Sequence, residues 1–221
     1  MIHILILSDI HGSSHAIDFL HNEISQVDII AIAGDFTNFG GYHVVEPILS
    51  TLHRFNASIV AVCGNCDLPE INELMIEQGI SVDGRTRTIH SVTFVGLGGS
   101  LPCPGHTPNE TEDQHFGEGL KQALGSWKGS SEQLIVLTHQ PAHGTTLDLT
   151  GHLRHTGSRA LRRFIEMHRP ILAISGHIHE ARGIDHIGPT TLVNPGPFKA
   201  GYYAIAQIEG TEVRVQLKEM R

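Results

Sequence analysis

The sequence predicts an α/β protein in which a single domain, residues 1–221, contains two β-sheets. In the first half of the chain, short apolar runs rich in β-branched residues alternate with helix-like patterns, the order typical of a parallel sheet. After Arg85 the pattern changes to adjacent strands, which indicates a second sheet. The length of 221 residues favours one large domain, and no linker, repeat or run of charges divides it.

Three strands, each followed by a helix, are predicted before residue 80. Their apolar runs are continuous rather than alternating, which is typical of strands covered on both faces. The predicted elements are strand Ile2–Ser8, a helix through Ile17, Leu20, Ile24 and Val27, strand Asp28–Ala33, helix Val44–Phe55, strand Ser58–Cys63 and helix Glu70–Gln78.

The second half of the chain predicts more strands than helices. Turn-forming Pro and Gly residues mark one long loop, and Val213, Val215 and Leu217 alternate with polar residues, which predicts a half-exposed last strand. The predicted elements are strands Arg87–His90 and Thr93–Leu97, loop Pro102–Gln114, helix Glu118–Trp127, strand Leu134–His139, helix Ser158–His168, strand Ile171–Ser175 and an antiparallel tail, Thr190–Lys218, with a turn at Glu209–Gly210.

The composition excludes some classes of function and some cellular locations. A formal charge of −8 disfavours stable binding to nucleic acid or to an anionic membrane, because both need clustered Lys and Arg. Three cysteines are too few for a secreted disulfide framework, and the N-terminus lacks the basic region of a signal peptide. No stretch approaches the ~18 apolar residues of a transmembrane helix. We therefore expect a cytoplasmic protein.

Metal-capable side chains follow five of the predicted strands at the point where each strand ends. Because ligands bind at the carboxyl ends of strands in α/β sheets, we expect these side chains to converge on one crevice. Oxygen and imidazole ligands suit Mn, Fe, Zn or Ni, and seven of them suit two cations that share one carboxylate. An excess of His, 17 against 15 Lys plus Arg, also favours metal binding. In chain order the residues are Asp9, His11, Asp35, Asn65, His139, His177 and His179.

Each of these residues alone has an ordinary structural interpretation. An Asp after a strand is often a helix N-cap, and Gly34-Asp35 fits a plain turn. His139 fits a hydrogen-bonded core residue, and His177 and His179 fit an exposed pair. For there to be no site, these ordinary interpretations would all have to hold, in order, at five strand ends. A common site is therefore favoured.

The ordered set of motifs resembles the calcineurin-like metallophosphoesterase superfamily, in particular its small prokaryotic phosphodiesterase branch. The resemblance implies a sandwich of two mixed β-sheets flanked by helices. It rests on Asp9-x-His11, Gly34-Asp35, Gly64-Asn65-Cys66-Asp67, His139 and Gly176-His177-Ile178-His179, and segments 138–144, 157–159, 176–182 and 194–196 resemble one branch closely.

The same resemblance assigns the ligands to two metals. Asp35 would bridge the two ions. One ion would be held by Asp9, His11, Asp35 and His179, and the other by Asp35, Asn65, His139 and His177.

One position departs from the family pattern. Where the family usually has a His that contacts the phosphoryl group and helps to protonate the leaving group, this chain has Cys66, which leaves the general acid open. The candidate catalytic residues are therefore Cys66 and the ligands His11, Asn65 and His139, together with His155, a loop residue that we expect to reach the phosphate.

Cys63 and Cys66 also form a Cys-x-x-Cys pattern, which has a redox interpretation. Redox chemistry would need Cys66 at a helix start with a low pKa. Cys63 instead ends a buried strand, where a free Cys behaves as a small hydrophobe.

Together these observations predict a phosphoesterase with two divalent or trivalent metal ions per chain (Mn, Fe, Zn or Ni). We expect it to hydrolyse phosphodiesters, or else phosphomonoesters, by attack of a metal-bridging hydroxide. The expected partner is a small phosphate-ester substrate, and the chain is compatible with a homo-oligomer. Two alternatives are a catalytically weak, protein-binding scaffold of the same fold and a nonenzymatic metal-binding or redox protein. The intact ligand set favours the enzyme.

Overall fold

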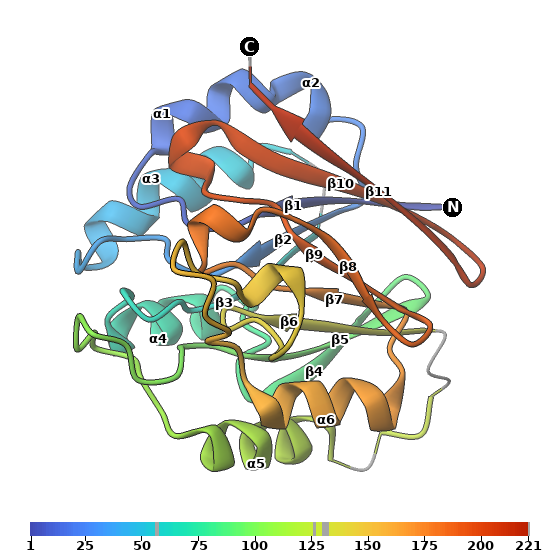
Figure 1. Ribbon diagram of the computed structural model, residues 1–221. Coiled ribbons are helices and arrows are strands. Elements are labelled where there is room, and N and C mark those ends of the chain that lie inside the picture. The colour runs from blue at the N-terminus through green and yellow to red at the C-terminus, as the bar shows by residue number, and fades with distance from the viewer. Residues whose placement is uncertain (56–57, 126, 130–132, 221) are drawn as a thin grey trace.

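In the computed structural model, residues 1–55, 58–125, 127–129 and 133–220 are described. Two β-sheets pack face to face, and helices cover the outer side of each sheet (Figure 1). Both sheets contain parallel and antiparallel strand pairs. The structure therefore confirms the predicted fold class, an α/β sandwich of two mixed β-sheets flanked by helices.

The described elements follow the chain in this order. The strands are β1 (Ile2–Leu7), β2 (Ile29–Ala33), β3 (Ser58–Val62), β4 (Arg85–Ile89), β5 (Val92–Leu97), β6 (Leu134–Thr138), β7 (Leu172–Ile174), β8 (Gly183–Ile187), β9 (Thr190–Asn194), β10 (Tyr202–Glu209) and β11 (Glu212–Glu219). The α-helices are α1 (Ser14–Ile17), α2 (His21–Ile24), α3 (Tyr42–Leu52), α4 (Pro69–Glu77), α5 (Asp113–Leu124) and α6 (Arg159–His168). Short 3₁₀ helices are η1 (Asp18–Leu20), η3 (Thr146–Asp148), η4 (His179–Ala181) and η5 (Phe198–Ala200).

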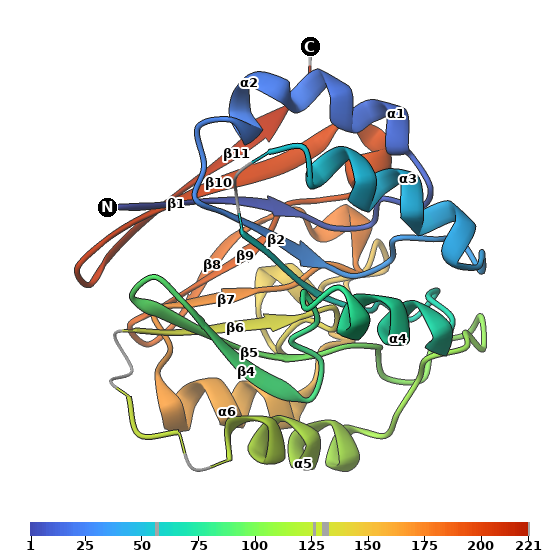
Figure 2. The same ribbon diagram turned by 180° about the vertical axis from the view of Figure 1, so that it is seen from behind.

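The first sheet has the strand order β11-β10-β1-β2-β3, and the second has the order β4-β5-β6-β7-β9-β8. Strands β1, β2 and β3 are parallel to one another, as are β5, β6, β7 and β9. Helices α1, α2 and α3 lie over the first sheet, and α5 and α6 lie under the second, as the view from behind also shows (Figure 2). The carboxyl ends of β1, β2 and β3 therefore lie on the same side of the first sheet.

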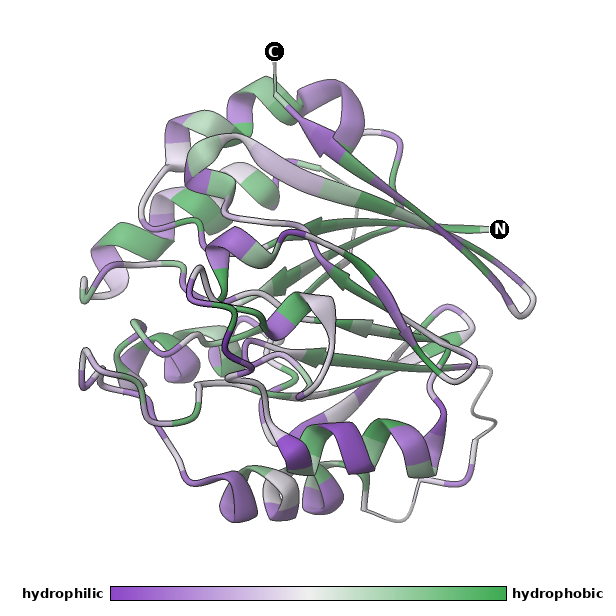
Figure 3. Cartoon of the chain, viewed as in Figure 1, coloured by the Kyte–Doolittle hydropathy of each residue, from purple (hydrophilic) through white to green (hydrophobic). Residues whose placement is uncertain are grey.

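Apolar side chains form three layers of core, and the strands between them are mostly hydrophobic (Figure 3). Successive residues of a strand point to opposite faces, so Leu5 of β1 packs under the helices of the first sheet while Ile4 packs against the second sheet. On the outer side of the second sheet, Phe116 of α5 and Phe164 of α6 pack with Val136 of β6. This burial on both faces explains the continuous apolar runs in the sequence.

Helix α5 differs from the predicted helix Glu118–Trp127. It begins at Asp113, inside the predicted loop, because the Asp113 carboxylate accepts hydrogen bonds from Ser158 and Ala160 at the start of α6. It ends before Gly125, whose φ of 51° breaks the helix. Contacts with a distant segment therefore set the start of α5.

The tail is only partly as predicted. Strands β10 and β11 form the predicted antiparallel hairpin, with the turn one residue later than expected, since Glu209 pairs with Glu212. Strand β9 instead belongs to the second sheet, where it is parallel to β7. Strand β8 was not predicted, because Asp185 and His186 interrupt its apolar pattern at the sheet edge. Among the described residues, no helix is long and apolar enough to cross a membrane.

Candidate metal centre

The loops that follow β1, β2, β6 and β7 are joined by backbone hydrogen bonds just beyond the strands. The Asp9 N–H donates to the Gly34 carbonyl at 3.0 Å, and the His11 N–H donates to the Asp35 carbonyl at 2.9 Å. In the second sheet, the Gly176 N–H donates to the His139 carbonyl at 3.0 Å. These bonds join the loop after β1 to the loop after β2, and the loop after β6 to the loop after β7.

Four of the predicted ligands have a left-handed backbone conformation. The φ angles are 54° at Asp9, 46° at His11, 53° at Asp35 and 69° at His177. Such a conformation costs about 1 kcal/mol or more for a residue other than Gly, and it is concentrated at functional sites. These positions lie just beyond β1, β2 and β7, where the chain turns sharply after each strand.

Glycines allow the loops to approach one another closely. A Cβ added to Gly64 would overlap the Asp35 carboxylate, and a Cβ added to Gly176 would overlap the Ser8 hydroxyl and lie 2.8 Å from Asp9 Oδ2. The Gly that precedes Asn65 and the Gly that precedes His177 are thus required by the packing of the site.

The first part of the cluster contains Asp9, His11 and His179, whose ligand atoms lie within 4.8 Å of one another. His179 Nε2 is 3.1 Å from Asp9 Oδ1, and His11 Nε2 is 3.7 Å from Asp35 Oδ2. The Asp9 carboxylate is also fixed from behind, because the Ser8 hydroxyl donates to its Oδ2 at 2.6 Å.

His11 carries a free lone pair inside the site. Its Nδ1 donates to the Thr37 carbonyl at 3.1 Å, and burial lowers the pKa of the ring. In the neutral imidazole Nε2 therefore has no hydrogen. Among the described residues this Nε2 is buried and has no hydrogen-bond partner, and the side chain is only 9% exposed. A buried polar atom without a partner is costly, and a cation next to it would remove that cost.

The second part of the cluster is built around His139, which is completely buried. Its Nδ1 donates to the Ala33 carbonyl at 2.7 Å, and its Nε2 lies 2.9 Å from Asn65 Oδ1 and 3.5 Å from Asp35 Oδ2. Burial lowers the pKa of His139, but the Asp35 and Asp9 carboxylates and the Ala33 carbonyl together outweigh it and raise the pKa to about 9. The Asp35 and Asp9 carboxylates thus favour a positive charge beside His139 Nε2.

Asp35 lies between the two parts. Burial raises its pKa, but His139 and the other polar neighbours together have the opposite and larger effect, and the pKa of Asp35 stays well below its ordinary value. His177 completes the set, with its ring centroid 5.1 Å from that of His139. Burial lowers the pKa of His177 to about 4, which leaves the imidazole neutral and able to bind a metal. The contacts thus connect all seven predicted ligand residues in one cluster.

Cys66 faces the same cluster. Its Sγ lies within 4.8 Å of ligand atoms of His11 and Asp35, and its backbone N–H donates to Asp35 Oδ1 at 2.8 Å. Burial, followed by the Asp35 charge, raises the pKa of the thiol, and burial also raises the pKa of Cys63. Raised values oppose the redox interpretation, which needs a thiolate at neutral pH.

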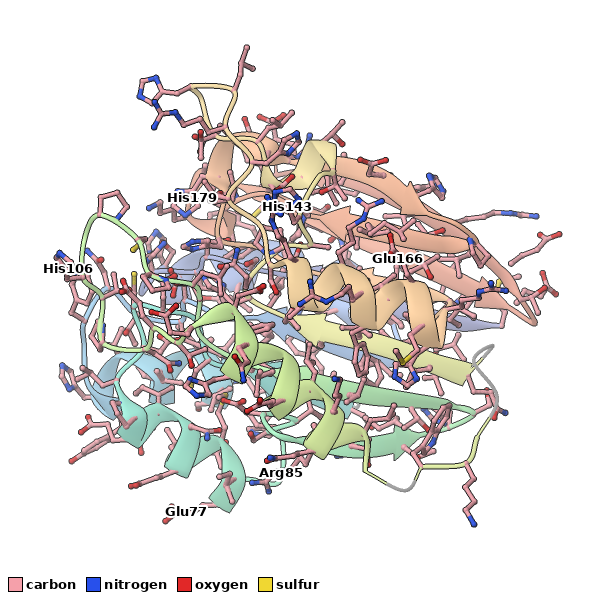
Figure 4. The ribbon with its side chains drawn as sticks, turned by 60° about the horizontal axis from the view of Figure 1, so that its bottom comes forward. Glu77, Arg85, His106, His143, Glu166 and His179 are labelled. Carbon is pink, nitrogen blue, oxygen red and sulfur yellow. The ribbon has the colours of Figure 1, made fainter. Side chains whose placement is uncertain are left out.

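His155 is placed differently from the other predicted site residues. It lies on the loop after η3, where its Nδ1 is 2.7 Å from the buried Asp148 carboxylate and its ring is 5.6 Å from that of His143. No hydrogen bond or ion pair joins it to the described residues of the cluster. Figure 4 labels His143, which lies between β6 and η3, and His179, the first residue of η4.

Several supporting residues were not assigned a role from the sequence. Asp67 accepts hydrogen bonds from the N–H groups of Thr37 and Gly64, which ties together the loops after β2 and β3. Burial and the Asp35 charge raise the pKa of Asp67 to about 6. The Asn194 side chain donates to the Ile178 carbonyl and so fixes the segment between the predicted ligands His177 and His179. Both residues lie in segments that resemble the family, so their positions were detectable although their contacts were not.

A two-sheet α/β sandwich with buried carboxylates and imidazoles at its strand ends defines a class of protein, the metallophosphoesterases. Residues 2–181 match the calcineurin-like phosphoesterase family, and the chain belongs to that family.

The chain is also similar to a further protein sequence and to two solved structures. The chain is 33% identical over 175 residues to an uncharacterized protein of Methanocaldococcus jannaschii, a match that covers 77% of this chain and 78% of the relative. The crystal structure of TT1561 from Thermus thermophilus has a TM-score of 0.78 at 18% identity and covers 100% of this chain and 99% of that one. A dimetal phosphatase from Danio rerio has a TM-score of 0.67 at 10% identity, with coverage of 100% and 99%. These two structures share the fold.

Proposed function

We propose that this protein hydrolyses phosphodiesters with the help of two metal ions, one held by Asp9, His11, Asp35 and His179 and the other by Asp35, Asn65, His139 and His177. The observation that carries the proposal is the buried His11 Nε2, which has no described hydrogen-bond partner and faces two buried carboxylates. The similar fold of a protein described as a dimetal phosphatase supports the number of metals.

Bound cations of this kind lower the pKa of water to about 7 and neutralise phosphoryl oxygens. The side chains of the protein would hold these cations in a preorganised arrangement. The Thr37 and Ala33 carbonyls accept from the Nδ1 atoms of His11 and His139, so Nε2 is the atom of each ring that would face a cation. At His139 the cation would take the place of the proton that Nε2 carries in the metal-free protein. Asp35 supplies negative charge between the two rings at 3.7 and 3.5 Å.

Diester rather than monoester preference is supported by the resemblance to the small phosphodiesterase branch. Cys66 lies beside the ligands, where the substrate phosphate would bind, and we propose that its thiol contacts the phosphate. We also propose that the His155 ring, oriented by Asp148, contacts the substrate. Unchanged kcat and KM in His155→Ala would remove that residue from the site.

The decisive experiment is a panel of phosphodiesters and phosphomonoesters assayed on metal-free protein reconstituted separately with Mn, Fe, Zn and Ni. Elemental analysis of the same samples gives the metal content. We expect two metals per chain and turnover of diesters. Two metals without turnover of any ester would favour the scaffold alternative, and one metal or none would contradict the two-metal site.

A further inference from the structure

The loop between β5 and α5 packs against the metal ligand Asn65. Its outer end carries His106, labelled in Figure 4. The Asn109 backbone N–H donates to the Asn65 carbonyl at 3.1 Å, and the Asn109 side chain donates to the Gly64 carbonyl at 3.1 Å. Closer to the site, the Asn65 amide nitrogen donates to Thr107 Oγ1 at 3.0 Å. The loop therefore touches both the backbone and the side chain of this ligand.

The direction of these hydrogen bonds is fixed by Glu110. Its Oε1 lies 2.7 Å from Thr107 Oγ1 and also accepts from the Thr107 N–H and the Cys103 thiol. Hydrogen bonds from Cys103 and Thr107 lower the pKa of Glu110 to about 2, so the group is a carboxylate and only accepts. The single hydroxyl hydrogen of Thr107 must then point to Glu110. Its oxygen is left to accept from Asn65.

This arrangement determines which end of the Asn65 amide faces the metal ligands. Because the nitrogen end is held by Thr107, the oxygen end points to His139, with Oδ1 at 2.9 Å from Nε2. An amide oxygen can bind a cation, whereas an amide nitrogen carries two hydrogens and cannot. The reversed amide would place those hydrogens at the metal position.

We propose that Thr107, with its hydrogen bond to Glu110, is a positioning residue that holds the Asn65 amide with its oxygen toward the second metal. The inference rests on the proposed function, since it assumes that a cation binds between Asn65 and His139. By this proposal the β5–α5 loop, which supplies none of the proposed ligands, helps to orient one of them.

The test compares three variants of the full chain by calorimetric titration of metal-free protein with Mn²⁺. Thr107→Val keeps the shape of the side chain but removes the hydroxyl, and Thr107→Ser keeps the hydroxyl. Thr111→Val is the matched control, because Thr111 lies on the same loop and its side chain makes no hydrogen bond to any described residue. Loss of a residue that orients a ligand costs about 10–100-fold in metal affinity.

We expect Thr107→Val to lose about 10–100-fold in affinity at one of the two Mn²⁺ sites, with the other site unchanged. Thr107→Ser and Thr111→Val should bind Mn²⁺ like the wild type. Equal loss in Thr107→Val and Thr107→Ser, or no loss in either, would overturn the positioning role. A wild type that binds no Mn²⁺ or a single ion would instead contradict the proposed function, so the two failures are distinguishable.

A purely structural role of Thr107 predicts a different result. It would lower the melting temperature of Thr107→Val without changing its Mn²⁺ affinity at either site. The side-chain NH₂ resonances of Asn65 in the metal-free protein give a second readout. We expect them to shift in Thr107→Val and to stay in place in Thr111→Val, and unshifted resonances in Thr107→Val would also overturn the inference.

Discussion

Asp35 has contacts on both sides of its carboxylate. Oδ2 lies 3.7 Å from His11 Nε2 and 3.5 Å from His139 Nε2, and Oδ1 accepts from the Cys66 N–H at 2.8 Å. A carboxylate so placed can share its charge between two cations, whereas an amide has no charge to share. This position is compatible with the bridging role that we propose for Asp35.

We therefore predict that Asp35→Asn weakens both metal sites. Titration of the metal-free variant with Mn²⁺ should show lower affinity at each site than in the wild type. Asp18→Asn, which changes an exposed carboxylate on η1, is the control and should bind both ions normally. Weakening confined to one site would show that Asp35 is a ligand of one ion and no bridge.

Cys66 is a poor replacement for the usual His at its position. Burial raises the pKa of its thiol, so the group is protonated at neutral pH, but a thiol is a weak hydrogen-bond donor. Efficient general acid catalysis needs a pKa near the working pH. Without a good acid, the leaving group departs with little protonation, and its own basicity should control the rate.

We predict that aryl phosphodiesters are cleaved much faster than alkyl ones, with a steep dependence on leaving-group pKa. Cys66→His should flatten that dependence, and Cys66→Ala should change aryl-ester turnover little. A leaving-group series on the three proteins, with metal content measured for each, checks both statements. A large loss of aryl-ester turnover in Cys66→Ala at full metal content would show that the thiol takes part.

At the scale of elements, the position of each predicted ligand depends on how closely neighbouring loops approach one another. Gly176 connects β7 to His177, and a Cβ at this position would overlap the Ser8 hydroxyl and crowd the Asp9 carboxylate. Forcing extra atoms into a packed site costs about 1–3 kcal/mol. The strain would fall on the loop that carries His177 and His179.

Gly176→Ala should therefore lower the free energy of unfolding by about 1–3 kcal/mol and weaken Mn²⁺ binding. Gly151→Ala is the matched control, because the Cβ would meet Glu180 Oε1 only at 3.6 Å and the backbone is not left-handed there. Chemical denaturation and metal titration of both variants provide the measurements. If the two variants behaved alike, close packing at Gly176 would not be what places the last two ligands.

The sequence was sufficient to predict the strands whose side chains are buried on both faces of a sheet. The continuous apolar runs of β1, β2 and β6 predicted those strands, and the polar residue after each run predicted a ligand. Strand β8 was missed, because an edge strand needs no continuous apolar run. Thr107 was also missed, since its role depends on contacts to Asn65, 42 positions away in the chain, and no local pattern marks such a contact.

At the scale of the whole molecule, the site joins the two halves of the sandwich. Asp9, His11, Asp35 and Asn65 follow strands of the first sheet, while His139, His177 and His179 follow strands of the second. The proposed arrangement gives each ion ligands from both sheets. Since these ligands converge only in the folded chain, metal binding should stabilise the fold as a whole.

We predict that removing metal with a chelator lowers the melting temperature and that Mn²⁺ restores it. A ligand at 100 times its Kd stabilises the folded state by about 2.7 kcal/mol per site, which corresponds to roughly 5–11 °C for a domain of this size. Asp35→Asn should gain much less from the same Mn²⁺ concentration, because both sites are weakened. Differential scanning calorimetry of the two proteins, each with chelator and with Mn²⁺, makes the comparison. A wild type with the same melting temperature in both conditions would contradict the link between the two sheets through bound metal.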